Sequence, residues 1–226
     1  MAVCYWCGKE VLDSEGAREH IVPWTLLQDV SGDISEFILP AENAHGTCNK
    51  TLGNNYEHDF CQIVFHYSAS DPRAAKHTAS KIKNLKRCIH YAWNQFRKMQ
   101  KVGNTVMIDL DPKDKESFEM IIKKILKGLY FKRMGRFLDT DDEYIVKIVW
   151  NTLNLEKDQV SANQVELFLR KLNNVPSSGN SVFEYRFVRT TDSVDTSLWE
   201  LLFYKRFHVY LFVIHKDDAS GFSNLK

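Results

Sequence analysis

Two short pairs of metal-binding residue types constrain the fold of this chain more than any other feature of its sequence. Cys4 and Cys7 form a C-x2-C pair, and His45 and Cys48 form an H-x2-C pair further along the chain. Each pair can supply two corners of a zinc tetrahedron, so together they predict a structural Zn²⁺ site that fixes the first part of the chain. The alternative is a solvated His45 and cysteines that are buried as small apolar residues.

The composition is that of a folded protein without a membrane-spanning segment. Of the 226 residues, 44% are hydrophobic and 12% are aromatic, which allows a sizeable core and excludes a wholly disordered chain. The longest apolar stretches, such as 209–214, are too short to cross a bilayer, and the first residues show no signal-peptide pattern. We therefore expect a cytoplasmic protein with reduced cysteines and no membrane partner.

Charge is strongly segregated along the chain, although the net charge is only +1. Residues 1–60 carry three basic and ten acidic side chains, whereas residues 72–101 carry nine basic and no acidic ones. From residue 102 onward the charges cancel, 18 against 18. This segregation favours an anionic partner for the middle of the chain.

The hydrophobic pattern predicts an α+β fold in which the kind of element changes along the chain. Residues 1–60 have short, irregular segments, with one expected strand at "SEFILP". A helix is expected from near Cys48 towards Phe65. Alternation and a high density of aromatic and β-branched residues predict antiparallel strands at the end of the chain, in "VFEYRFVRT" and "WELLFYKRFHVYLFVI".

Apolar residues at steps of three and four predict amphipathic helices in the central part of the chain. The three segments are 74–101, 115–133 and 163–172. The Asp71-Pro72 pair is a start signal for the first segment, and Gly135 is a stop signal for the second.

A carboxylate, an imidazole and an amide lie between and directly after the two metal-binding pairs. Glu19 and His20 are adjacent in "EHIVP", and Asn49 follows the last cysteine in "HGTCNKTLGN". A hard divalent cation prefers oxygen ligands such as Glu19 and Asn49, and an imidazole such as His20 can take a proton near neutral pH. These groups suit phosphodiester hydrolysis, which needs an activated water and stabilisation of negative charge. Neighbouring strand residues face opposite sides, so Glu19 and His20 can share a site only where the backbone is irregular.

The order of "CYWC", "EHIVP" and "HGTCNKTLGN" resembles the HNH endonucleases, the ββα-metal or His-Me-finger nucleases, over residues 1–60. The hydrophobic pattern predicts a helical, then β-rich accessory region in residues 71–226, and the resemblance implies a zinc-bound ββα-metal nuclease unit in residues 1–70. It assigns Glu19 and Asn49 to a catalytic Mg²⁺ or Mn²⁺, His20 to general-base catalysis, and DNA as the substrate. Small HNH proteins commonly serve as effectors of bacterial antiviral defence or of mobile elements, which is the role expected here.

Two positions depart from the HNH pattern. The second metal-binding pair begins with His45 where the family usually has cysteine, and zinc accepts an imidazole in that place. Pro40 stands where a middle asparagine usually braces the loop of the active histidine, and Asn43 is the nearest candidate for that role.

The basic side chains of the central segment are interpreted as a stripe that binds the DNA backbone without reading its sequence. These side chains are Lys76, Lys83, Arg87, Lys98 and Lys101. The alternative is an ordinary solvated helix face. Glu57, His58 and Asp59 follow Asn49 on the same expected helix and are interpreted as part of a solvated face, with a contact to metal or DNA as the alternative.

The rival interpretation of the whole chain is a non-catalytic zinc module that binds nucleic acid or a protein partner. Residues 102–226 show no catalytic motif, and their aromatic strands are interpreted as a partner or sensor module or as scaffold alone. A protein partner such as a sensor or an ATPase is therefore considered alongside DNA. A simple zinc module has no need of Glu19, His20 and Asn49 together. These three residues therefore separate the two hypotheses.

Overall fold

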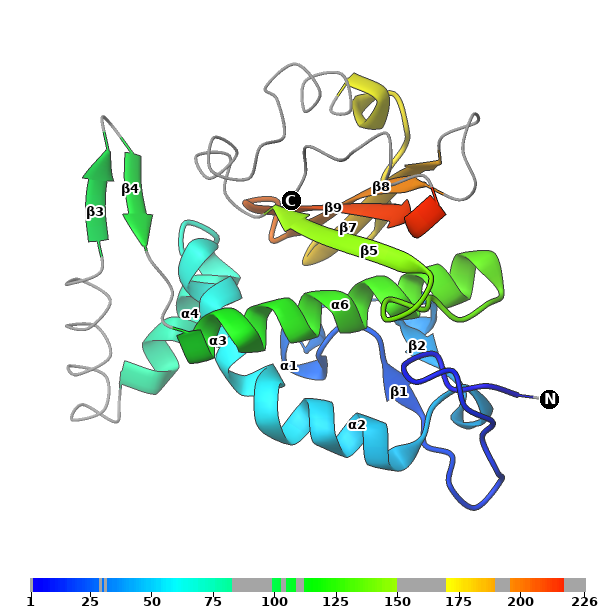
Figure 1. Ribbon diagram of the computed structural model, residues 1–226. Helices are drawn as coiled ribbons and strands as arrows, with labels where there is room; N and C mark the ends of the chain where they lie inside the picture. Colours follow the sequence, from blue (N-terminus) through cyan, green and yellow to red (C-terminus); the bar gives the residue numbers. More distant parts are fainter. Residues whose placement is uncertain are drawn as a thin grey trace.

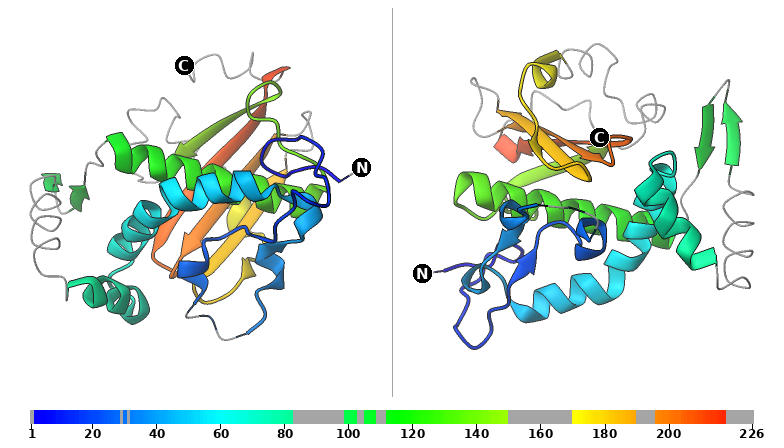
Figure 2. Two further views of the ribbon diagram at one scale, coloured as in Figure 1. Left: turned by 90° about the horizontal axis from the view of Figure 1, so that it is seen from below. Right: turned by 180° about the vertical axis from the view of Figure 1, so that it is seen from behind.

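A computed structural model shows an α+β protein in which one long helix separates two layers. The structure describes residues 2–28, 30, 32–82, 99–102, 105–108, 112–149, 170–189 and 196–217. The long helix α6 (Pro112–Met134) runs across the molecule, with the N-terminal elements on one side and an antiparallel sheet on the other (Figures 1 and 2). No helix of the described ranges is long and apolar enough to span a membrane.

The N-terminal region is built on a very short two-stranded sheet. Strand β1 (Glu19–His20) pairs antiparallel with strand β2 (Ile38–Leu39), so that Glu19 lies opposite Leu39 and His20 opposite Ile38. The short helix α1 (Trp24–Leu27) lies between the two strands in the sequence. The strand expected at "SEFILP" is confirmed only at its end, because residues Ser35–Phe37 form the 3-10 turn η1.

A helical run follows the second metal-binding pair, as the sequence predicts. It consists of α2 (Gly46–Leu52), the π-helical turn η3 (Gly53–Glu57) and α3 (His58–Tyr67), after the 3-10 turn η2 (Ala41–Asn43). Helix α3 packs against the rest of the molecule through Phe60, whose ring lies 5.7 Å from that of Phe118 on α6 and 5.8 Å from that of Phe203 in the sheet. The hydrophobic core therefore continues across the expected boundary at residues 70 and 71.

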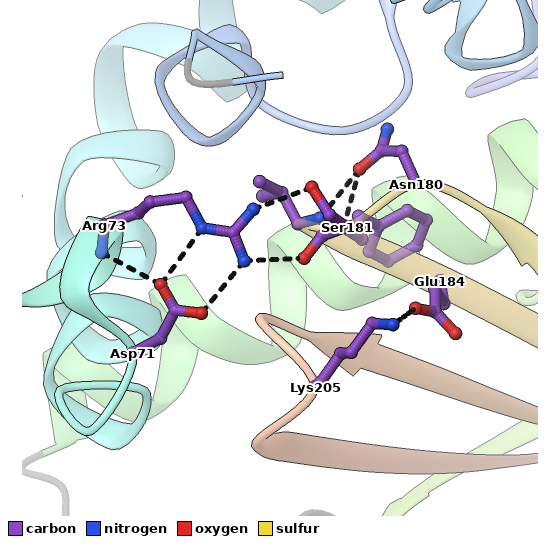
Figure 3. A network of polar contacts seen from close by, with 8 residues as sticks. Asp71, Arg73, Asn180, Ser181, Glu184 and Lys205 are labelled. Carbon is purple, nitrogen blue, oxygen red and sulfur yellow. Dashed lines mark hydrogen bonds and ion pairs between the residues drawn. The ribbon is translucent and has the colours of Figure 1, made fainter. Parts of the chain in front are cut away.

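Helix α4 (Pro72–Ile82) begins where the Asp71-Pro72 signal places it. The Asp71 carboxylate accepts a hydrogen bond from the Arg73 main-chain N–H at 2.9 Å, which caps the first turn. The Arg73 guanidinium then donates to Asp71 and to both the hydroxyl and the carbonyl oxygen of Ser181 (Figure 3). This network ties the start of α4 to the loop before the third strand of the C-terminal sheet.

The prediction of one helix over 74–101 is wrong at its end. Strand β3 (Met99–Val102) pairs antiparallel with strand β4 (Thr105–Ile108). The sequence signal is a Gly-Asn pair between two β-branched residues, which is typical of a two-residue hairpin and outweighs the continued helical spacing. The part of the predicted helix at 83–98 lies outside the described residues.

The helix predicted over 115–133 is confirmed as α6. The helix ends at Met134, directly before Gly135. Gly135 has a left-handed φ of 69° and donates its N–H to the Phe131 carbonyl at 2.9 Å, which closes the last turn. Gly128 allows close packing, because a Cβ built there would lie 2.8 Å from the side chain of Ile21. Helix α6 thus lies directly against the residue that follows the Glu19-His20 strand.

The C-terminal strands predicted from alternation form a five-stranded antiparallel sheet in the order β5-β9-β8-β7-β6. They are β5 (Tyr144–Val149), β6 (Ser178–Gly179), β7 (Phe183–Arg189), β8 (Ser197–Phe203) and β9 (Phe207–His215). Trp199, Leu201 and Phe203 alternate on β8 and are fully buried, with Trp199 against Tyr130 of α6. Glu200, between Trp199 and Leu201, faces the other side of the sheet. Of the helix predicted at 163–172, the structure describes only the end, where residues 170–173 are helical.

Candidate metal centre and candidate catalytic residues

The four predicted zinc ligands come together in one cluster. Within the described ranges, the ligand atoms of Cys4, Cys7, His45 and Cys48 all lie within 4.8 Å of one another. Nδ1 of His45 lies 3.4 Å from Sγ of Cys7, and its Nε2 lies 2.9 Å from the main-chain carbonyl oxygen of Glu10. A carbonyl oxygen that holds one ring nitrogen of a histidine orients the ring and leaves the other nitrogen available to bind metal. The cluster is compatible with a structural Zn²⁺, and His45 is one of its members rather than a solvated residue.

Local backbone structure brings the two pairs together. Gly8, with a left-handed φ of 71°, closes the turn after the first pair by donating its N–H to the Cys4 carbonyl at 2.9 Å. The main-chain N–H of Tyr5, inside the first pair, donates to the Asn43 carbonyl just before the second pair at 2.9 Å, and an isolated bridge joins Gly16 to His45. Because His45 immediately precedes α2, Cys48 lies in the first turn of that helix.

The electrostatics of the cluster favour a bound cation. Burial raises the pKa of Cys4, but hydrogen bonds to its sulfur from main-chain N–H groups outweigh this and lower the pKa overall. Burial and the neighbouring thiol groups of Cys4 and Cys7 raise the pKa of Cys48 to about 12. The crowded sulfurs therefore resist full deprotonation by themselves, and a divalent cation would remove that repulsion.

Glu19 is buried and held by a lysine from α6. Its side chain is 1% exposed, and its Oε1 lies 2.8 Å from Nζ of Lys124, which is fully buried and also donates to Glu57. Oε2 of Glu19 is buried and has no hydrogen-bond partner among the described residues. Burial raises the pKa of Glu19, and the Lys124 ammonium offsets part of that rise. One carboxylate oxygen is thus anchored and the other is unpaired.

His20 is half-buried beside an aromatic ring. The centroid of its imidazole lies 5.3 Å from that of Trp24, and the two rings are tilted by 44°. Burial lowers the pKa of His20, and the nearby charges of Arg18 and Lys124 lower it further. The imidazole is therefore neutral near pH 7, which is the state that can accept a proton.

Asn49 lies on α2 and contacts the chain just before Glu19. Its Nδ2 donates to the main-chain carbonyl of Arg18 at 3.3 Å. The amide nitrogen is thereby engaged, while the amide oxygen is the group that a hard cation would take. This hydrogen bond ties Asn49 to the backbone that leads into the Glu19-His20 strand, although Asn49 is separated from that strand in the sequence.

Glu19 and His20 occupy consecutive positions of β1, and their burial follows strand alternation. Glu19 points inward to α6, whereas His20 lies partly exposed against Trp24. The two side chains therefore do not lie on one face of the strand. That Glu19 and Asn49 hold a divalent cation stays a prediction.

The predicted DNA-binding stripe is described only in part. Lys76 is exposed on α4, and Lys101 lies in β3 rather than on the expected helix. Lys83, Arg87 and Lys98 lie outside the described residues. That this stripe binds nucleic acid stays a prediction. Lys101 no longer belongs to it by helical spacing, because it lies in a strand.

Three contributors near the motif were missed or misread from the sequence. Glu57, interpreted as solvated, hydrogen-bonds the buried Lys124, so that interpretation is wrong. Lys124 itself falls within the apolar stripe of α6, three residues after Ile121 and four before Gly128, and this position is the signal that could have revealed it. Trp24 is 48% exposed beside His20, and nothing in its spacing indicates this.

A second buried carboxylate lies far from the motif, on the outer face of the C-terminal sheet. Glu200 is 3% exposed; Arg186 Nε donates to its Oε2, and Nδ1 of His208 lies 2.8 Å from its Oε1. Burial alone would raise the pKa of Glu200, but the bonds with His208 and Arg186 lower it to about 2. A cavity of about 130 Å³ adjoins it, lined by Ser177, Glu184, Tyr185, Arg186, Glu200 and Leu202.

Comparison with protein-family models, curated proteins and solved structures finds no match for this chain. The assignment of a function therefore depends on the residues themselves.

Proposed function

We propose that the chain is a metal-dependent HNH-type endonuclease that hydrolyses DNA phosphodiester bonds and carries a structural zinc. The observation that carries this proposal is the hydrogen bond from Asn49 to the Arg18 carbonyl, which joins α2 to the Glu19-His20 strand. The order of elements, two short antiparallel strands followed by α2 and flanked by the zinc-ligand pairs, supports a ββα-metal unit.

His20 is the proposed general base. Its neutral imidazole would take a proton from water as the water oxygen bonds to phosphorus, and the bond from phosphorus to the leaving sugar oxygen would break. The partial exposure of His20 gives a substrate access to this side chain. General-base catalysis of this kind is typically worth about 10²–10⁴-fold in rate.

Glu19 and Asn49 are the residues that would hold a Mg²⁺ or Mn²⁺ ion. The buried Oε2 of Glu19, which has no hydrogen-bond partner in the described part of the chain, fits such a ligand, because a carboxylate oxygen without a partner in the interior is costly unless something binds it. The ion, when bound, would stabilise negative charge on the phosphate and the leaving oxygen. Lys124 would keep the other Glu19 oxygen fixed.

The test is incubation of zinc-loaded protein with plasmid and linear DNA, with added Mg²⁺ or Mn²⁺ and without added divalent cation. We expect cleavage only when the cation is present. Because a strong chelator would also remove zinc, the control without added cation is preferable to chelation, and zinc content is measured in every sample. A folded, zinc-loaded protein that cuts no DNA with either cation would contradict the proposal.

A second candidate function is a non-catalytic zinc module that binds nucleic acid or a protein partner. The observation that favours it is the inward orientation of Glu19, whose ion pair with buried Lys124 resembles a structural contact. The same incubation separates the two functions, since DNA binding without cleavage is the result expected of this candidate.

A further inference from the structure

Trp24 is unusual among the large aromatic residues that the structure describes. It is 48% exposed, whereas Trp199 is fully buried, and the other large hydrophobic residues that are exposed in the described ranges are the aliphatic Leu12 and Ile145. Trp24 is the first residue of α1, whose Leu26 and Leu27 enter the core. The helix therefore holds the indole at the surface while its other apolar residues anchor it.

The exposed indole lies directly beside the proposed general base. The ring centroids of Trp24 and His20 are 5.3 Å apart, and Trp24 nevertheless keeps about half of its surface exposed. Pro23, which precedes it, is buried and fixes the start of α1. The backbone that carries the indole is thus anchored on both sides, by Pro23 and by the buried leucines of α1.

A cationic side chain completes the surroundings of His20. Arg18 is exposed and lies two residues before His20, and side chains two residues apart in an extended chain point to the same face. Its main-chain carbonyl is held by Asn49, which fixes the backbone from which the guanidinium projects. An arginine and an open aromatic ring beside one imidazole match the two parts of a nucleic-acid strand, its phosphate and its base.

We propose that Trp24 stacks on an unpaired nucleobase next to the phosphate that is cut, with Arg18 neutralising the backbone there. An indole can stack only on a base whose face is free, so the substrate class is single-stranded DNA or a duplex opened at the cleavage position. The placement of this base next to a cleaved phosphate rests on the proposed nuclease function. The stacking contact itself can be measured by binding alone.

The test compares Trp24→Ala, Trp24→Phe and Trp24→Leu with wild type on a labelled single strand and its duplex. Fluorescence anisotropy without added divalent cation gives the dissociation constant, and cleavage with Mg²⁺ gives KM and kcat. We expect wild type to bind the single strand more tightly than the duplex. Trp24→Ala and Trp24→Leu should weaken single-strand binding and raise KM by about 10- to 100-fold, the range of one lost base stack, with kcat within a few-fold.

Trp24→Phe should recover most of the affinity because it keeps an aromatic face, and the matched control Leu12→Ala, another exposed hydrophobic residue, should behave as wild type. Equal single-strand affinities of wild type and Trp24→Ala would overturn the inference, as would a loss confined to kcat, which would make Trp24 a support for His20. A wild-type protein that binds single strands through Trp24 but never cuts them would contradict the nuclease proposal and leave the stacking site standing.

Discussion

The N-terminal region and the C-terminal sheet each bury one glutamate among the described residues, and the two carboxylates differ in how many of their oxygens have hydrogen-bond partners. Glu200 in the sheet is 3% exposed and has both oxygens engaged, by Arg186 and by His208. Glu19 in β1 is 1% exposed, shares Lys124 with Glu57, and leaves Oε2 without a partner among the described residues. The pKa of Glu200 is lowered to about 2, whereas burial raises the pKa of Glu19.

The difference separates a structural carboxylate from one that is suited to bind something. A buried carboxylate with both oxygens hydrogen-bonded is suited to a structural role, because hydrogen bonds and ion pairs offset the cost of its desolvation. A buried oxygen without a partner costs free energy and is retained most readily where a ligand will use it. Glu19 therefore belongs to the proposed catalytic region and Glu200 to the scaffold.

The largest expected effect is the loss of zinc, which should affect the two regions unequally. Cys4→Ser removes one ligand of the cluster and should abolish zinc binding, because the free energy of binding structural zinc, about 10–16 kcal/mol in small sites, is also folding free energy. We expect hydrogen exchange to show lost protection before residue 70 and retained protection in β8 and β9. Elemental analysis gives the zinc content.

The matched control for zinc loss is Cys61→Ala, since Cys61 is a buried cysteine of α3 outside the cluster. It should keep about one zinc per chain. Wild-type protein that is purified without zinc and is fully folded would contradict the metal site.

The next largest effect concerns the lysine that anchors Glu19. Lys124→Met leaves Glu19 and Glu57 without their shared cation in the interior, and breaking a buried pair in this way typically costs about 3–5 kcal/mol. Denaturant unfolding measures the change. Adding Glu19→Gln to the variant should restore part of the stability, because the uncompensated charge is then removed.

Lys115→Met is the control for that experiment. Lys115 is exposed on the same helix and makes only a weak contact, 3.9 Å from Glu119, so its loss should change stability by less than about 0.5 kcal/mol. If Lys124→Met unfolds at the same denaturant concentration as wild type, the ion pair does not anchor Glu19.

A smaller effect, and one that depends on pH, is expected at Glu200. A carboxyl whose pKa is 4.5 in the unfolded chain and about 2 in the folded one contributes stability that is fully present above pH 4.5 and is lost as the pH falls through about 2. The contribution at neutral pH is about 3 kcal/mol. Glu200→Gln should therefore remove part of the acid dependence between these two values.

Thermal unfolding at several pH values measures this dependence, with the exposed Glu143→Gln as control. Identical pH profiles for Glu200→Gln and wild type would show that Glu200 is not the satisfied carboxylate described above.

Local patterns in the sequence predicted those parts of the molecule that depend on near neighbours. The spacing of Cys4 and Cys7 and of His45 and Cys48 indicated the metal cluster, and periodicity indicated α6 and strands β7 to β9. The strand β3 was missed because helical spacing was followed to Lys101, although the Gly-Asn pair that comes directly after the strand is a hairpin signal.

The surroundings of the predicted catalytic residues depend on contacts that no local pattern records. The pairing of Glu19 with Lys124 joins β1 to α6 across the hydrophobic core, and only the tertiary structure decides which carboxylate the buried lysine meets. The exposure of Trp24 depends in the same way on how α1 is anchored by Leu26 and Leu27.

The most direct test of the account is the Mg²⁺ dependence of DNA cleavage by His20→Ala, Glu19→Gln and Glu200→Gln, with folding and zinc content checked for each variant. His20→Ala should cut about 10²–10⁴-fold more slowly at an unchanged half-saturating Mg²⁺ concentration, because it loses the base and no metal ligand. Glu19→Gln should need more Mg²⁺, and Glu200→Gln should cut as wild type does at neutral pH. A folded His20→Ala protein that cuts at the wild-type rate would contradict the nuclease assignment.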